Sequence, residues 1–102
     1  MFRHFEHAFD WDARKDLLNI AKHGIGFERA STVFLDPNAI SVYDEMHSQM
    51  EDRWVTLGMD RSGIVLAVAH TFVQDFGTKG LVRLISARKA TPKEVREYGI
   101  GR

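Results

Sequence analysis

The sequence contains no cysteine, which excludes disulfide bonds and a zinc site built on thiolates. It also lacks any apolar run long enough to span a bilayer. The first residues, MFRHFEHAFDWD, mix apolar side chains with Arg, His, Glu and Asp, so they lack the apolar core of a secretory signal peptide. These absences predict a cytoplasmic protein that does not associate with membranes.

Several catalytic and cofactor-binding motifs are also missing. The chain has no glycine-rich phosphate loop, no HExxH motif and no GxSxG motif. The polar segment over residues 44–52 contains Asp, Glu and His, but their spacing matches no ligand pattern typical of a metal site. We therefore predict no cofactor and no bound metal, and we expect any catalysis by this chain to be metal-independent.

Net charge is also absent, yet the charges are divided unevenly along the chain. Residues 79–102 carry seven cations and two anions, a net charge of +5. Residues 1–78 carry seven cations and twelve anions, a net charge of −5. The basic segment fits an anionic partner, although two solvated faces of opposite charge explain the division equally well.

The N-terminal third predicts one strand and two helices. The strand is expected at residues 2–9, where apolar and polar residues alternate. The first helix begins after Asp10 or Asp12, either of which can cap it, and ends at Gly24. Its apolar side is expected to consist of Leu17, Leu18, Ile20 and Ala21. The second helix is expected over residues 27–34.

The remainder of the chain predicts strands joined by turns and then a last helix. Apolar segments indicate four strands, at residues 39–43, 53–59, 64–72 and 81–87. Short turns between the later strands favour antiparallel pairing. Thr91, Pro92 and Glu94 form a capping box, which predicts a helix over residues 92–98.

These elements predict a single domain over residues 1–102, because a chain of this length buries one core. The fold class is α+β, with an antiparallel sheet of about four strands, two N-terminal helices and one C-terminal helix. We expect the helices to lie against one face of the sheet.

Three cations in the last strand and just after it are candidates for anion binding. Strict alternation places Arg83 among aliphatic residues on one side of the strand, and Ser86 and Arg88 on the other side. A guanidinium in apolar surroundings needs either an acidic partner or an anionic ligand, and the sequence leaves both open. Arg88 and Lys89 precede the capped helix, whose amides can complete a phosphate site, although surface solubility explains them as well.

Five histidines are candidates for proton transfer, because imidazole titrates near neutral pH. His70 follows an apolar run and is expected to be a core histidine, and His4 and His7 are expected to be surface or partner-contact residues. His23 and His47 lie in polar segments, where functional residues concentrate, so they are the candidate general acid or base.

The order of several motifs resembles the BrnT family of ribonuclease toxins, from the BrnT/BrnA type II toxin–antitoxin systems. The motifs are FDWD, KHG, a D-x-x-H segment, RWVTLGM, a strand that ends in AHT, and RLISARKAT, and they extend over residues 9–98. The resemblance implies a fold related to the RelE/ParE toxins, RNA cleavage that slows translation, and neutralisation by a BrnA-like DNA-binding antitoxin. Contact with operator DNA is implied only through the complex with the antitoxin.

The resemblance also implies the residues of the site. Those that it assigns to catalysis are Lys22, His23, His47, Arg53, Arg83 and Arg88, and those that it assigns to substrate binding are Ser86 and Lys89. We predict that the ribose 2′-hydroxyl attacks the adjacent phosphorus, which accounts for a preference for RNA over DNA. His23 or His47 would take the proton, the other histidine or Lys22 would assist the leaving oxygen, and the arginines would hold the phosphate.

Two other functions are compatible with the same residues. The domain can act only as an antitoxin partner and co-repressor, or it can poison gyrase as ParE toxins do, since a fold does not fix a function. Trp54 or Tyr98 could stack on a base of the bound nucleic acid.

Overall fold

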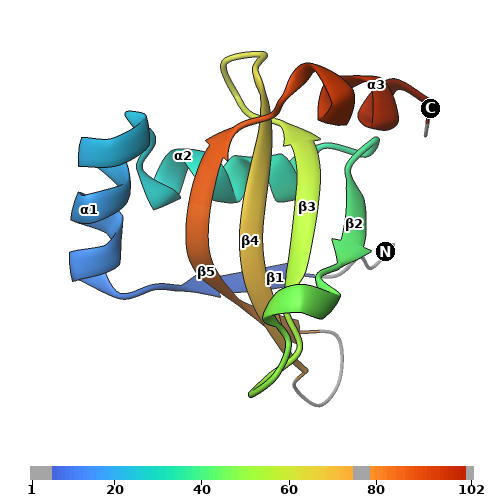
Figure 1. Cartoon of the computed structure of the whole chain (residues 1–102). Helices are drawn as coiled ribbons and strands as arrows, with labels where there is room; N and C mark the ends of the chain where they lie inside the picture. The colour runs from blue at the N-terminus through green and yellow to red at the C-terminus, as the bar shows by residue number, and fades with distance from the viewer. Residues whose placement is uncertain (1–5, 75–78, 101–102) are drawn as a thin grey trace, which may run out of the picture.

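The computed structural model describes residues 6–74 and 79–100, which form one sheet with helices on both of its faces (Figure 1). The elements in chain order are β1 (Glu6–Asp10), α1 (Ala13–His23), α2 (Phe27–Ser31), the 3-10 helix η1 (Thr32–Leu35), β2 (Ile40–Tyr43), the 3-10 helix η2 (Glu45–His47), β3 (Trp54–Met59), β4 (Val65–Gln74), β5 (Lys79–Lys89) and α3 (Pro92–Ile100). The part of the expected first strand at residues 2–5, and His4 with it, lies outside the described residues. In the described part of the chain, no helix has the length and apolar character needed to cross a membrane.

The sheet contains five strands in the order β1-β5-β4-β3-β2. Strand β1 pairs with β5 in parallel, and the other three pairs are antiparallel. The prediction of an antiparallel sheet of about four strands is therefore wrong for β1, which adds a fifth, parallel strand. The antiparallel pairing of β2 to β5, the α+β class and the central position of β4 are confirmed. The first and last strands become neighbours only through tertiary packing, which the local alternation of side chains does not encode.

A bulge in β5 changes which side chains share a face. Ala69 pairs with Ser86 while His70 pairs with Leu84, so Ile85 is an extra residue without a partner in β4. The extra residue shifts the alternation by one position. Arg83 therefore lies on the same face as Ser86 and Arg88, and the prediction that placed it on the opposite face is wrong.

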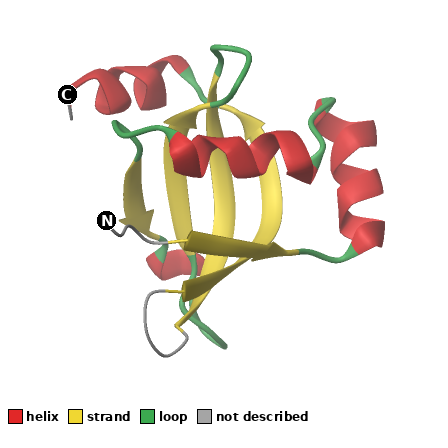
Figure 2. Cartoon of the chain, turned by 180° about the vertical axis from the view of Figure 1, so that it is seen from behind, coloured by secondary structure: helices red, strands yellow, loops and turns green. Residues whose placement is uncertain are grey.

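The main core lies between the sheet and the segment that contains α2 and η1, which crosses the back of the sheet (Figure 2). Its fully buried residues are Ile25, Phe27, Ala30, Val33, Leu66, Val68, Val82, Leu84 and Ala87. Helix α3 packs against the opposite face, where Tyr98 joins Leu57 and Ala67 in a smaller cluster. The expectation that all helices cover one face is therefore wrong, and α3 leaves the rest of its face open.

The ends of α1 and α3 follow the signals in the sequence. Asp12 caps α1 by accepting a hydrogen bond from the amide of Arg14, and Gly24 ends the helix with a left-handed φ of 73°. In α3 the Thr91 hydroxyl accepts from the amide of Glu94, and the Glu94 carboxylate accepts from the amide of Thr91. The predicted capping box is confirmed.

Helix α1 contacts the sheet through a polar residue rather than through its leucines. Asn19 is buried, whereas Leu17, Leu18 and Ile20 are exposed. The Asn19 amide donates to the carbonyls of Ile25 and Ala87 and accepts from the amide of Ala87. The predicted apolar side of this helix exists, but it faces away from the sheet.

Candidate active site

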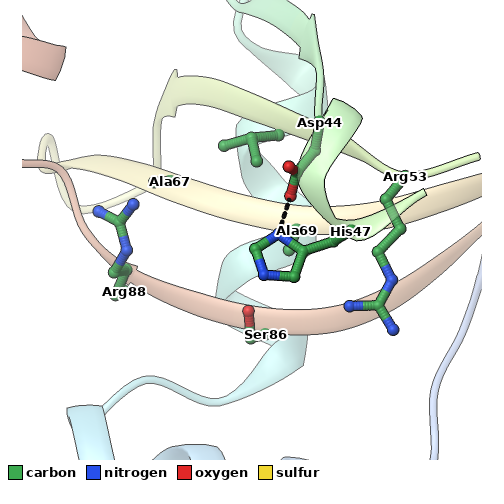
Figure 3. Close-up of a pocket in the computed structure, with 8 residues that line it drawn as sticks. Asp44, His47, Arg53, Ala67, Ala69, Ser86 and Arg88 are labelled. Atoms are coloured by element: carbon green, nitrogen blue, oxygen red, sulfur yellow. Dashed lines mark hydrogen bonds and ion pairs between the residues drawn. The ribbon is translucent and has the colours of Figure 1, made fainter. Parts of the chain in front are cut away.

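A polar hollow of about 220 Å³ lies on the open part of the face that α3 partly covers (Figure 3). The residues that line it come from the η2 segment and from strands β3, β4 and β5, and they are Asp44, His47, Arg53, Val55, Ala67, Ala69, Ser86 and Arg88. Four of the residues that the resemblance assigns to the site, His47, Arg53, Ser86 and Arg88, are thus brought together.

The segment between β2 and β3 is held in place by hydrogen bonds within itself. The amide of Asp44 donates to the carbonyl of Arg53, and the Ser48 hydroxyl donates to the carbonyl of Asp44. The same hydroxyl accepts from the amide of Arg53. These bonds close the segment into a compact loop, so that His47 and Arg53 project from its two ends toward the hollow.

Asp44 orients the ring of His47. A carboxylate oxygen of Asp44 lies 2.8 Å from Nδ1 of His47, and because an ionised carboxylate only accepts, Nδ1 carries the proton. This tautomer leaves Nε2 as a proton acceptor when the ring is neutral. In Figure 3 the ring lies between Arg88 and Arg53, and its second nitrogen points away from Asp44 toward the side of Ser86. The pair has the geometry of a general base and its orienting carboxylate.

Arg88 is fixed by Glu94 from the first turn of α3. Two parallel hydrogen bonds, 2.7 and 3.0 Å long, join the guanidinium to the carboxylate. Hydrogen bonds from Arg88 lower the pKa of Glu94 to about 2 against the opposing effect of burial, and the amide and hydroxyl of Thr91 contribute to the decrease. The same contact raises the pKa of Arg88. The guanidinium is therefore permanently charged and held at the rim of the hollow, with its remaining surface exposed.

Arg53 contributes the second cation of the hollow, and within residues 6–74 and 79–100 it makes no ion pair. The floor between the two arginines consists of the small side chains of Ala67 and Ala69, beside the exposed hydroxyl of Ser86. Small side chains leave space for a ligand, and two cations with a hydroxyl suit a phosphodiester. The arrangement can bind a phosphate next to a histidine that accepts a proton.

The other predicted site residues lie outside the hollow. Arg83 forms an ion pair with Asp10 of β1 at 3.1 Å, and both side chains are about half exposed. Lys89 is exposed at the end of β5, one position beyond Arg88. Lys22 and His23 occupy the last turn of α1, which lies beside the β5 edge in Figure 1.

Asp44 is the one residue of the hollow whose role the sequence prediction missed. Its signal was present, because the D-x-x-H spacing places the carboxylate three residues before His47.

Neither of the two residues expected to stack on a base is placed to do so in the hollow. Trp54 precedes Val55 and therefore faces the other side of the sheet, where it packs between Tyr43 and Phe72. Tyr98 is buried and donates to Asp36.

Over the two described ranges, no group of three or more histidine and acidic side chains is placed to hold a metal ion.

Comparison with known proteins identifies the family. The family model described as the ribonuclease toxin BrnT of type II toxin–antitoxin systems matches residues 11–94. The chain belongs to the BrnT family. Among solved structures, the ribonuclease toxin BrnT of Brucella abortus is similar, with a TM-score of 0.55 and 26% sequence identity over 79% of this chain and 92% of that chain. No curated protein sequence matches the chain.

The BrnT match includes every residue that lines the hollow, since these extend from Asp44 to Arg88. It also includes Lys22, His23, Arg83 and Lys89. Family membership makes the chain a member of a group of ribonuclease toxins whose systems contain an antitoxin. The relation to RelE/ParE toxins stays a prediction.

Proposed function

We propose that this BrnT-family chain is an endoribonuclease that cleaves RNA in the hollow without a metal ion, and that a BrnA-like antitoxin neutralises it. The observation that carries the proposal is the Asp44–His47 pair, which lies between Arg53 and Arg88 above a floor of small residues. The family supports RNA as the substrate class.

In the proposed reaction, the ribose 2′-hydroxyl supplies the nucleophile. Nε2 of His47 takes the hydroxyl proton, the 2′ oxygen forms a bond to the adjacent phosphorus, and the bond from phosphorus to the 5′ oxygen breaks. The products are a 2′,3′-cyclic phosphate and a 5′-hydroxyl. DNA lacks the attacking group, so it is not cleaved. General-base catalysis of this kind contributes roughly 10²- to 10⁴-fold to the rate.

The arginines stabilise the phosphate as charge accumulates on its oxygens. Arg53 and Arg88 project from the two sides of the hollow, so a phosphodiester between them contacts both guanidinium groups. Ser86 lies between them and can donate a hydrogen bond to a phosphate oxygen. Arg83 lies on the same face of β5 as Ser86 and Arg88, on the part of the strand that pairs with β1, so it adds a third cation along this face.

The leaving 5′ oxygen must receive a proton, and Lys22 or His23 remains our candidate for this step. Asn19 binds the backbone of Ala87, and the last turn of α1 follows directly, so both candidates are close to the end of β5 that carries Arg88 and Lys89. An RNA strand that continues from the hollow past Arg88 would therefore approach the end of α1.

The test is incubation of the purified protein with naked RNA in excess EDTA, beside the variants His47→Gln and His23→Gln. Fragments that end in 2′,3′-cyclic phosphate are expected from the parent and not from His47→Gln. Loss in His23→Gln as well would support His23 in the second proton transfer, and full activity there would leave Lys22 as the candidate.

Two results would contradict the proposal. Cleavage that stops in EDTA and returns with added Mg²⁺ would exclude the metal-independent mechanism. Full activity of a folded His47→Gln protein would exclude His47 as the base. Within the described residues no other histidine lines the hollow, so no second histidine there could replace it.

A further inference from the structure

Helix α1 presents its apolar side to solvent. Leu17 is 68% exposed, Leu18 is 62% exposed and Ile20 is 44% exposed, while the buried position of the helix is taken by Asn19. An ordinary surface helix has the opposite arrangement, with apolar residues against the core and polar residues outside. Neighbouring exposed leucines on a rigid helix are typical of a surface that a partner covers.

Helix α1 also carries exposed cations. Arg14, Lys15 and Lys22 are exposed on the same helix, and none of them forms an ion pair with another described residue. The two acidic residues near them bind backbone amides and not these cations. Asp12 accepts a hydrogen bond from the amide of Arg14, and Asp16 accepts one from the amide of Phe27. Helix α1 and its cap therefore combine exposed leucine side chains with three cations and two carboxylates, a net charge of +1.

This combination selects among the possible partners. A second copy of the chain would bring together two helices that both carry a net positive charge, and like charges across an interface oppose association. A nucleic acid would pair with the cations but would gain nothing from the leucines. A protein segment with apolar residues on one side and acidic residues beside them satisfies both features, as a helix that packs along α1 would do.

We propose that the outer surface of α1, formed by Arg14, Lys15, Leu17, Leu18 and Ile20, is the docking site for an acidic amphipathic segment of the antitoxin. This inference rests on the antitoxin partner in the proposed function, and it does not depend on RNA cleavage. The hydrogen bonds of Asn19 to Ala87 hold α1 rigidly against the β5 edge, so the surface needs no rearrangement before it binds. None of these five residues lines the hollow, so the antitoxin would hold the toxin at a surface separate from the hollow.

The experiment measures binding of the antitoxin from the same operon to the full chain by isothermal titration calorimetry. The two surface variants are the double substitutions Leu17→Gln with Leu18→Gln, and Arg14→Glu with Lys15→Glu. The matched control is Leu35→Gln, because Leu35 is 82% exposed but lies in η1, beyond the other end of α2. Circular dichroism and the RNA cleavage rate without antitoxin check that each variant keeps its fold and basal activity.

We expect each double variant to weaken antitoxin binding at least tenfold and the control to bind as the parent does. The parent's affinity is expected to fall as salt increases, and the charge-reversed variant is expected to lose that dependence. Equal affinity of the parent and both double variants would overturn the docking site while leaving the antitoxin partner intact. Failure of the parent to bind the antitoxin would overturn the partner and the docking site together.

Two further measurements test the excluded partners on the free chain. Sedimentation velocity reports self-association, and flotation with phosphatidylserine vesicles reports membrane binding, which basic amphipathic helices can also produce. A parent dimer, or vesicle binding, that the leucine substitutions abolish would overturn the assignment of this surface to the antitoxin. A monomeric parent that does not bind the vesicles would support the assignment of this surface to the antitoxin.

Discussion

The side-chain amide of Asn19 forms two hydrogen bonds with the backbone of Ala87, one in each direction, at 2.8 and 3.1 Å. This is the pattern with which a neighbouring strand would pair. Strand β1 stops opposite Arg83, so beyond that point no strand of the described residues pairs with β5 on that side. Asn19 takes the place of the missing strand at Ala87, and a third hydrogen bond to Ile25 secures the loop that follows α1.

Replacement of Asn19 should therefore destabilise the protein more than an ordinary surface change. Asn19→Ala leaves the amide and carbonyl of Ala87 buried without these partners, and each such loss costs roughly 1–3 kcal/mol. We expect a decrease of about 2–4 kcal/mol in the free energy of unfolding, measured by urea denaturation. The control Asn38→Ala removes an exposed side chain and should change stability by less than about 0.5 kcal/mol. Equal stability of the two variants would contradict the role of Asn19.

The Asp44–His47 pair predicts a specific effect on the catalytic rate. Asp44→Asn keeps the size of the side chain but removes the anion that fixes the tautomer of His47, so kcat should fall roughly 10²-fold with little change in KM. Asp52→Asn is the matched control, because Asp52 lies in the same segment and its carboxylate accepts a hydrogen bond from the exposed Tyr43 hydroxyl. Steady-state kinetics on a short RNA measures both. A rise in KM without a change in kcat would instead assign Asp44 to substrate binding.

Features with local signals could be predicted from the sequence. The Asp12 cap, the Gly24 stop and the capping box at Thr91 each satisfy backbone groups within a few residues, and all three are confirmed. The strands β2, β3 and β4 follow from alternation and apolar runs for the same reason. Four residues that line the hollow could also be predicted, because the order of the motifs resembles a known family.

Features that depend on distant contacts were missed. The bulge at Ile85 appears only when β5 is aligned with β4, and it reverses the face predicted for Arg83. The burial of Asn19 depends on an unpaired strand edge 68 residues away, so a rule that buries leucines assigns α1 the wrong side. The parallel pairing of β1 with β5 has the same origin.

Arg83 can act on RNA only if its ion pair with Asp10 is dispensable. Both side chains are about half exposed, so the pair is expected to contribute less than about 1 kcal/mol to stability. We predict that Arg83→Ala abolishes toxicity in cells while the fold stays intact, and that Asp10→Asn keeps the toxicity because it leaves the guanidinium free. Growth assays and thermal melting measure the two effects. Equal loss of toxicity in both variants would show that toxicity depends on the ion pair and not on contact between Arg83 and RNA.

The contact between Arg88 and Glu94 predicts how stability changes with pH. The pKa of Glu94 is lowered in the folded protein from 4.5 to about 2, so the folded state favours the ionised carboxylate. The stabilisation is complete above pH 4.5 and is lost as the pH falls toward 2. The shift alone corresponds to about 3 kcal/mol, and screening at the partly exposed Arg88 reduces the expected value to about 1–2 kcal/mol.

Glu94→Gln isolates this contribution. At pH 7 the variant should be less stable than the parent by about 1–2 kcal/mol, and the difference should shrink between pH 4.5 and pH 2.5 as Glu94 in the unfolded parent becomes protonated. Asp60, whose pKa is lowered to about 2 because hydrogen bonds from Ile64, Ser62 and Arg29 outweigh its burial, behaves alike in both proteins and cancels in the comparison. The control Glu97→Gln changes an exposed residue of the same helix and should follow the parent at every pH. Urea denaturation at several pH values gives the difference directly, and a difference that stays constant with pH would show that Glu94 stabilises the fold by its shape rather than by its charge.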